Sequence, residues 1–394
     1  MGRLFWSVLL LAAGVLAQIS PPNHSLWYVN LAVTEWGHWL IIPILLIWWP
    51  GWQAHAAGRV AASLALIAGV LVLMPAWKAR SYAQVIESRA AQLLGSASLP
   101  VTADAPARPS AFVLRDLIQG VGTPSIDWST QPYIKRGERE LQMDVYSPPP
   151  GTPMVGTGSG HPVILVVHGG LMGPPWQAGD RQEALNLNRY LAARGYYVIA
   201  IDYRLATEAP YPGPLEDVLA VLDMLHGMGG TNQGGMDPTR VVIIGRGGGA
   251  HLALMAAYAS RNPSIRGVVA LYPPTDLPAW YGAPSQPRVA DWQGWIHTFM
   301  GKPLNAESEA LYQAASPRMY ASSAPPTLLI HGARDPIVPP TQTERLTMTL
   351  RQSRRDVLSF QLPWATHSCD MNFHGPCGQA TTYLIERFLA RYAA

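Results

Sequence analysis

The stretch Gly-Arg-Gly-Gly-Gly at residues 245–249 has the setting of a reactive turn but lacks its reactive side chain. A short β-branched run, VVII, precedes it, and a helical pattern begins at Ala250. A strand, a sharp glycine turn and a helix form the nucleophile elbow G-x-S-x-G, which holds a serine in a strained turn. Here Gly247 occupies the serine position. Because glycine adopts such conformations without a Cβ penalty, the turn can form without a nucleophile.

Three other motifs carry groups that an elbow nucleophile would need. VILVVHGGLMG places His168, Gly169 and Gly170 after an apolar run, where glycine N–H groups can face a developing oxyanion. Asp335 lies in the loop of PPTLLIHGARDPIVPP, and His367 follows the last apolar run in QLPWATHSCD. The order nucleophile position, acid, histidine differs from that of chymotrypsin or subtilisin and is the order of α/β-hydrolases.

Together these motifs make residues 124–394 resemble the α/β-hydrolase superfamily, on the side of the hormone-sensitive lipase and acetyl-xylan/feruloyl esterase families. The segment YVIAIDYRLATEAPYPGPLEDV is similar to their D-Y-R-L-A-P-E segment, with Thr207 in place of proline. Leu171 replaces the third glycine of the usual H-G-G-G. The resemblance implies an α/β fold with a mostly parallel sheet, helices on both faces and a lid insertion. It also implies hydrolysis of carboxylic esters by a Ser-Asp-His triad, with no metal or cofactor.

The resemblance assigns roles to particular residues. His367 would be the general base and Asp335 its orienting partner. The amides of Gly169, Gly170 and Gly248 would stabilise the oxyanion. Since the nucleophile position holds glycine, the chain is expected to have little or no esterase activity as written.

Two explanations of the missing serine follow. One is an esterase of small or lipid-like esters whose nucleophile has been removed. The other is a naturally inactive protein that acts as a membrane-tethered ligand-binding or scaffold protein. The intact Asp335, His367 and HGG motif favour the first, because a binding protein has no chemical need for the base. Ser368 and Cys369 adjoin the histidine, but the elbow fixes where a nucleophile must point, so neither is expected to replace the serine.

Other residues near the motifs are expected to support the site. We interpret His168, His251 and His331 as structural, Asp202 and Arg204 as loop supports, residues 273–321 as a lid or pocket wall, and Trp176, Trp280, Trp292 and Trp295 as either acyl-pocket or lid-core residues.

Strand and helix patterns alternate from residue 124 onward. The predicted strands are 125–127, 141–146, 163–167, 198–202, 241–244, 267–271, 327–330 and 357–362. The predicted helices are 181–194, 215–228, 250–260, 341–351 and 380–391. Short apolar strands alternating with helices indicate a mostly parallel sheet covered on both faces, with the first two strands as an antiparallel hairpin.

The first 77 residues have a different composition. They contain three charged residues and eight of the 14 tryptophans, and they include apolar runs at 4–19, 29–49 and 61–77. Because a membrane-spanning helix needs roughly 20 residues, residues 1–80 are predicted to form about three transmembrane helices. The first run also has the features of a cleavable signal peptide, with Arg3 before it and small residues near Ala17. Residues 81–123 are predicted to be a helical connector and linker to the hydrolase domain at 124–394.

The net charge and the small number of cysteines limit the partners and metals that this chain is expected to bind. The net charge is +3 with no basic block, which argues against nucleic acid. The two cysteines, Cys369 and Cys377, are not accompanied by a second ligand pair at the spacing typical of a zinc site, so zinc is not expected. A disulfide between them would indicate an extracytoplasmic domain, and two free thiols are the alternative.

Overall fold

The core of the molecule is an eight-stranded sheet. The computed structural model describes residues 2–95, 107–172, 179–228, 235–284 and 288–394. The strands are β1 (Trp128–Arg136), β2 (Arg139–Tyr146), β3 (His161–Val167), β4 (Tyr197–Ile201), β5 (Met236–Arg246), β6 (Ile265–Leu271), β7 (Thr327–Gly332) and β8 (Val357–Leu362). They are ordered β1-β2-β4-β3-β5-β6-β7-β8. The pairs β1–β2 and β2–β4 are antiparallel and the others are parallel. The sheet is therefore mostly parallel, as the sequence predicts, whereas the antiparallel β2–β4 pair was not predicted.

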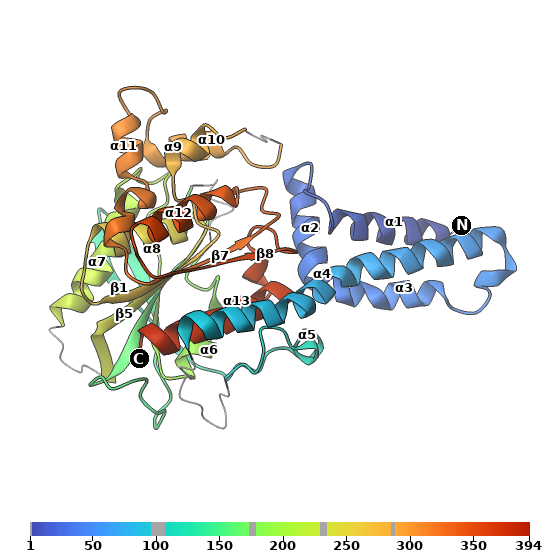
Figure 1. Ribbon diagram of the computed structural model, residues 1–394, viewed down its shortest axis with the longest axis horizontal. Helices are drawn as coiled ribbons and strands as arrows, with labels where there is room; N and C mark the ends of the chain where they lie inside the picture. Colours follow the sequence, from blue (N-terminus) through green and yellow to red (C-terminus); the bar gives the residue numbers. More distant parts are fainter. Residues whose placement is uncertain (1, 96–106, 173–178, 229–234, 285–287) are drawn as a thin grey trace.

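Side chains of successive residues in β3 enter two different hydrophobic clusters. Val163, Leu165 and Val167 pack with the helices of one face, while Ile164 and Val166 pack with those of the other. This follows from the two-residue period of a strand and explains why the run is apolar throughout. The first face carries α7 (Gly213–Gly227), α8 (Gly248–Ala259) and α12 (Thr341–Gln352), and the second carries α6 (Leu185–Ala192) and α13 (Pro376–Tyr392) (Figure 1).

The expected lid at 273–321 is a helical segment between β6 and β7. It contains α9 (Leu277–Tyr281), α10 (Trp292–Met300), α11 (Glu309–Ala314) and η5 (Pro317–Ser323). Figure 1 shows α9, α10 and α11 grouped together at one end of the sheet domain. The segment is therefore placed to cover one end of the strands.

The N-terminal helices form a second structural region. They are α1 (Gly2–Leu16), α2 (His24–Trp36), η1 (Gly37–Leu40), α3 (Ile41–Ile47), η2 (Trp52–Ala54) and α4 (Ala56–Leu94). In Figure 1, α1, α3 and the first part of α4 project away from the sheet, and α2 lies at the base of this projection. Two stretches, His24–Ile47 and Ala56–Leu94, are long and apolar enough to cross a membrane, whereas α1 with 15 residues is shorter. Core helices of soluble proteins and signal sequences meet the same criterion of length and composition.

The expected connector is not a separate element. Residues 81–94 continue α4 without a break, and Ala79, Ala83, Ile86, Ala90 and Leu94 are buried in one cluster with α13. Their spacing of three and four residues places them along one face of the helix, and the small alanines allow close helix packing. The second half of α4 therefore belongs to the core of the sheet domain.

Part of the expected linker is also packed. Phe112 is buried, and the Arg108 Nη2 atom donates a hydrogen bond to Gln379 of α13 at 2.9 Å. Arg108 also pairs with Asp116 of the short helix α5 (Leu114–Gln119). Residues 96–106 of this linker lie outside the described residues.

Several predicted element boundaries differ from the structure, and strand β5 begins at Met236, five residues before the predicted 241. The first strand begins at Trp128, after the predicted 125–127, because the sequence STQPYIKR forms an exposed edge strand that tolerates Pro132. The last helix begins four residues earlier than predicted, with Pro376 at its first position, where a missing N–H costs nothing. The helix expected at 181–194 begins at Leu185, since residues 181–184 form a turn.

Candidate active site

Gly247 forms the turn between β5 and α8. Its φ of +50° and ψ of −116° lie in a region that costs an L side chain about 1–3 kcal/mol, so glycine relieves strain here. Its N–H donates to the Leu271 carbonyl at 3.0 Å. A Cβ atom at this position would lie 3.5 Å from Nε2 of His367 and 3.7 Å from Cε2 of Tyr272. The turn thus has room for a small side chain directed at the histidine.

His367 and Asp335 form a hydrogen-bonded pair, as expected. His367 lies beyond β8, and its Nδ1 atom is 2.7 Å from Oδ2 of Asp335. Asp335 lies beyond β7, where its Oδ1 accepts hydrogen bonds from the amides of Ile337 at 2.8 Å and Val338 at 2.9 Å. His331 Nε2 lies 3.2 Å from Oδ2. The carboxylate therefore holds the imidazole with its other nitrogen toward the elbow.

The surroundings of Asp335 keep it ionised. Burial opposes the charge, but the charge of His367 and hydrogen bonds from His331 and His367 outweigh it and lower the pKa of Asp335 to about 2. A carboxyl group whose pKa is lowered on folding stabilises the folded chain above its unfolded pKa, near 3.9. This contribution is lost as the pH falls toward 2. At neutral pH Asp335 is a fixed negative partner of the histidine.

The expected oxyanion loop lies against the elbow. A Cβ on Gly248 would lie 2.5 Å from Cβ of Leu171, so only glycine permits this approach. Gly169, Gly170 and Gly248 all line the same cavity as Gly247. The Gly169 N–H, however, donates to Oε2 of Glu183 at 2.6 Å.

The Glu183 carboxylate is thus hydrogen-bonded to the Gly169 amide, one of the three amides expected to bind an oxyanion. The amides of Gly170 and Gly248 are the other two. The sequence motifs do not identify Glu183. It lies in the turn before α6 and belongs to none of the four motifs.

Residues 202–206, with the sequence DYRLA, contact the expected oxyanion loop through hydrogen bonds and ring stacking. The Tyr203 hydroxyl donates to the His168 carbonyl at 2.7 Å, and the two rings stack with centroids 4.3 Å apart. The Ala206 N–H donates to the Leu171 carbonyl at 3.2 Å. The position of the loop therefore depends on the segment 202–206.

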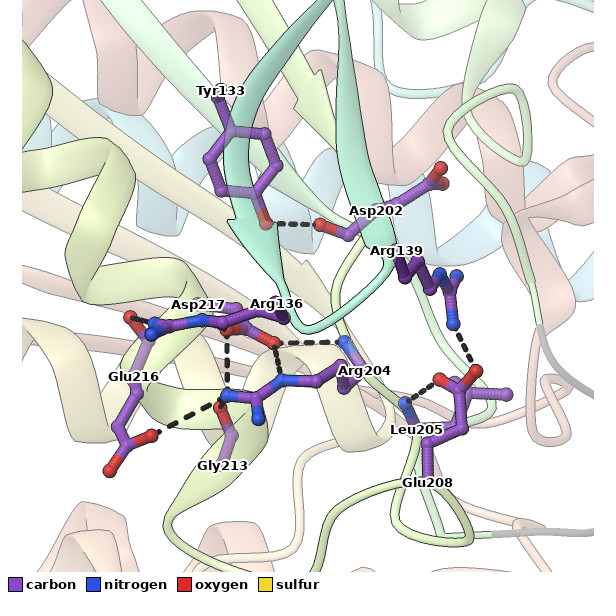
Figure 2. Close-up of polar contacts among 10 residues, drawn as sticks. All are labelled: Tyr133, Arg136, Arg139, Asp202, Arg204, Leu205, Glu208, Gly213, Glu216 and Asp217. Carbon is purple, nitrogen blue, oxygen red and sulfur yellow. Dashed lines mark hydrogen bonds and ion pairs between the residues drawn. The ribbon is translucent and has the colours of Figure 1, made fainter.

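Ion pairs and hydrogen bonds to the buried Asp217 carboxylate hold residues 202–206 in place (Figure 2). The Arg204 guanidinium binds both oxygens of Asp217, with Nε to Oδ2 at 2.8 Å and Nη2 to Oδ1 at 2.9 Å. Asp217 is fully buried and also accepts a hydrogen bond from Nε of Arg136 at 2.8 Å. The Tyr133 hydroxyl donates to the Asp202 carbonyl at 2.5 Å. The Arg204 side chain thus holds this segment, whereas Asp202 contributes its backbone carbonyl and its carboxylate pairs with Arg181.

We expect Asp217→Ala to destabilise the folded chain by about 1.5–3 kcal/mol, because it removes the buried carboxylate that accepts hydrogen bonds from the partly exposed Arg204 and Arg136 guanidiniums. Thermal or denaturant unfolding measures the change. Glu216→Ala is the matched control, since this neighbour also pairs with Arg204 but has a side chain that is 52% exposed. An exposed pair contributes about 1 kcal/mol or less. Equal losses in the two variants would contradict this account.

A second buried network joins the elbow to the histidine loop. Arg246, directly before Gly247, donates from Nε to Oδ2 of Asp370 at 2.5 Å. The Tyr272 hydroxyl donates to the other oxygen of Asp370 at 2.7 Å, and its ring centroid is 4.5 Å from that of His367. Burial, followed by the charge of Asp370, raises the pKa of Tyr272, so the phenol remains a donor. Sequence reasoning identified neither Tyr272 nor Asp370.

A disulfide joins Cys369 and Cys377, whose Cα atoms are 5.6 Å apart. It connects the loop after His367 to the first turn of α13. Of the two alternatives for these cysteines, the structure has the bridged one. An oxidised Cys369 has no thiol with which to act as a nucleophile. Ser368 lines the cavity beside His367.

These groups surround a cavity of about 300 Å³. Trp280 and Trp295 of the lid line it, whereas Trp292 is buried in the domain core and Trp176 lies outside the described residues. His24, Trp27 and Tyr28 of α2 form another part of the wall. The sequence did not predict that a residue of the N-terminal region would reach this cavity.

Comparison with known proteins identifies the family. Residues 143–350, more than half of the chain, match the family model BD-FAE. The chain belongs to the BD-FAE family. Among relatives of this BD-FAE member, "Esterase LipQ" of Mycobacterium tuberculosis is 28% identical over 60% of this chain and 56% of its own length. "Esterase LipC" of the same organism is 28% identical over 58% of each chain, so the match spans less than two thirds of these relatives.

A solved structure has the same fold. The propionate-bound esterase Est2 of Thermogutta terrifontis aligns with 66% of this chain and 93% of its own, with a TM-score of 0.51 and 19% identity. The α/β-hydrolase fold predicted from the motifs is therefore confirmed.

Proposed function

We propose that this chain has the site of a membrane-attached carboxylic ester hydrolase of the triad type, and that it is inactive as written because Gly247 occupies the nucleophile position. The observation that carries the proposal is the position of His367. Its Nε2 atom lies 3.5 Å from where a Cβ at residue 247 would be, and its Nδ1 atom is held by Asp335. The names of LipQ and LipC as esterases, and of LipM as a probable carboxylic ester hydrolase, support esters as the substrate class.

With a serine at residue 247 the groups account for a complete reaction. His367 takes the hydroxyl proton as Oγ attacks the ester carbonyl, and the oxyanion accepts hydrogen bonds from Gly170 and Gly248. The C–O bond to the alcohol then breaks, and His367 returns its proton to the leaving alcohol. Water, deprotonated by the same histidine, hydrolyses the acyl-enzyme. With glycine the site retains the base and the amides but has no hydroxyl to form the covalent bond.

Membrane attachment rests on the N-terminal helices. Large side chains that are exposed there include Trp39 at 45%, Leu45 at 63% and Trp49 at 67%. Water is a poor solvent for such a surface, whereas lipid is a good one. The disulfide supports an extracytoplasmic domain. Extraction of the full chain tests this, because we expect it to require detergent.

The deciding experiment for function is Gly247→Ser assayed with p-nitrophenyl esters of graded acyl length. If the Gly247→Ser variant hydrolyses these esters, the result supports an esterase whose nucleophile has been removed. A serine variant that binds esters but does not cleave them would favour the alternative, a naturally inactive ligand-binding or scaffold protein.

We expect Asp335→Asn in the Gly247→Ser chain to lower turnover by about 10⁴-fold, because the amide no longer holds the correct histidine tautomer. Since the pKa of Asp335 is about 2, this group does not titrate between pH 5 and 8, so the loss should be similar throughout that range. A pH–rate profile of both proteins measures it. A loss below about tenfold would contradict the role given to Asp335.

A further inference from the structure

One helix belongs both to the apolar N-terminal region and to the wall of the active-site cavity. Helix α2 supplies His24, Trp27 and Tyr28 to the cavity that contains Gly247 and His367. The same helix begins the 24-residue apolar stretch His24–Ile47. Helix α2 lies where the apolar helices meet the sheet domain (Figure 1). Because α2 lines the cavity, the cavity lies at this junction.

The contacts of α2 fix it in this position. Trp27 is 5% exposed, and its ring centroid is 6.3 Å from that of His367. The His24 N–H donates to the Arg288 carbonyl at 2.9 Å, and His24 Nδ1 lies 2.8 Å from the Val289 carbonyl, both in the lid. The beginning of α2 is therefore connected to the lid as well as to the cavity.

The other end of α2 is held by the element that follows His367. The Asn372 side-chain amide donates to the Glu35 carbonyl at 2.9 Å, and the Cys377 N–H donates to Oε2 of Glu35 at 3.2 Å. The distance between α2 and His367 is thus fixed by bonds at both ends of the helix.

The lining of the cavity indicates what it would accept. Among its described residues Glu183 alone is an aspartate, glutamate, lysine or arginine, and the wall is otherwise mostly apolar, with Trp27, Trp280 and Trp295 as large aromatic surfaces. An anionic headgroup would find no lysine or arginine among these residues. Tyr28 lines the cavity and is also 47% exposed, so the lining is continuous with the outer surface of α2.

We propose that the substrate of this site is a neutral lipid ester that enters the cavity from the membrane along α2. The inference rests on the proposed function and on membrane attachment. An ester with long acyl chains partitions into the bilayer, since each buried CH₂ contributes about 0.8 kcal/mol. A cavity that opens beside the apolar helices receives such a molecule without its passage through water. The acyl chain would pack on Trp27 and Tyr28 while the ester group lies between Gly247 and His367.

The unmodified chain provides the first test, because without a serine it should retain an ester uncleaved. The full chain is placed in phosphatidylcholine vesicles that contain a diacylglycerol with a photoreactive diazirine in one acyl chain. We expect cross-links on α2 peptides that contain Trp27 and Tyr28, and on the cavity peptides that contain Trp280. A phosphatidylglycerol with the same diazirine should label the exposed faces of α1–α4 but not the cavity peptides that contain Trp280. Diacylglycerol labels confined to those exposed faces would overturn the proposal.

Hydrolysis provides the second test. In the Gly247→Ser chain we compare kcat/KM for vesicle-borne diacylglycerol with kcat/KM for p-nitrophenyl butyrate. Trp27→Ala should lower the ratio of the two by about tenfold, since it removes an aromatic surface that a long acyl chain covers more fully than butyrate does. Trp36→Ala is the matched control, because Trp36 lies on α2, is exposed and is absent from the cavity lining. Equal ratios in the two variants would overturn the proposal.

The two tests separate this inference from the proposed function. If the serine variant hydrolyses butyrate but the diacylglycerol never labels the cavity, the ester hydrolase stands and lipid entry is wrong. If the diacylglycerol labels the cavity but the serine variant cleaves no ester, lipid binding stands and the hydrolase proposal is wrong.

Discussion

Replacement of Gly247 by serine is expected to raise the turnover of short p-nitrophenyl esters by on the order of 10⁶-fold over the unmodified chain, to between about 1 and 1000 per second. The physical reason is that every other member of the reactive group is already placed. His367 and Asp335 are bonded at 2.7 Å, and the elbow retains its φ of +50°. The serine hydroxyl would need only to rotate toward Nε2 of the histidine.

The same substitution should lower stability. A side chain at this φ costs about 1–3 kcal/mol, so the serine chain should unfold at a lower temperature than the glycine chain. Gly247→Ala is the matched control because it introduces the same backbone strain without a hydroxyl. We expect both variants to lose similar stability, as measured by thermal unfolding, and the serine variant alone to gain activity.

Adding His367→Ala to the serine variant should abolish the gained hydrolysis. Two results would contradict the assignment. One is ordinary turnover in the unmodified chain that His367→Ala removes, which would mean that an activated water or another nucleophile acts at the site. The other is a folded serine variant that remains inactive although it binds ester.

The sequence predicted the reactive loops better than it predicted their surroundings. The elbow, Asp335 and His367 were found because each follows a short apolar run and belongs to a local motif that can be read within a few residues. Their chain order, together with the resemblance to α/β-hydrolases, predicted that they share one site. The structure brings these groups together as predicted.

Residues that reach the site from distant parts of the chain were missed. Trp27 lies 340 positions before His367 in the numbering, and no periodicity within α2 indicates which face meets the cavity. Glu183 and Asp370 are single carboxylates without a motif, and their roles depend on hydrogen bonds to Gly169 and to Arg246. Such partners follow from tertiary packing, which local propensity does not determine.

The structure also changes what is expected of a shortened chain. The sequence predicts that a chain starting near Pro124 is soluble without detergent. In the structure, removal of residues 1–123 uncovers the faces of α13 and β8 that contact α4. We therefore expect a chain of residues 124–394 to unfold or aggregate.

The free energy contributed by side-chain burial supports the expectation that residues 124–394 do not fold alone. Ile86, Leu94, Phe112 and Leu117 are all buried in the cluster shared with α13. Burying one such side chain contributes about 1.5–3 kcal/mol, so these four contribute roughly 6–12 kcal/mol. The whole stability of a domain is about 5–15 kcal/mol, and loss of this set can remove most of it.

A chain of residues 78–394 is the matched comparison, because it removes α1–α3 and the first half of α4 but retains Ala79–Leu94 and the segment that contains Phe112. We expect it to give a cooperative thermal transition, whereas the 124–394 chain should give none or should remain insoluble. Circular dichroism with thermal unfolding and size-exclusion chromatography measure both. A well-folded, monomeric 124–394 chain with a transition within about 2 °C of that of the 78–394 chain would show that residues 78–123 contribute less than about 1 kcal/mol and are only a tether. If the 78–394 chain alone folds, the second half of α4 is part of the hydrolase domain, and the boundary between the two regions lies near Trp77.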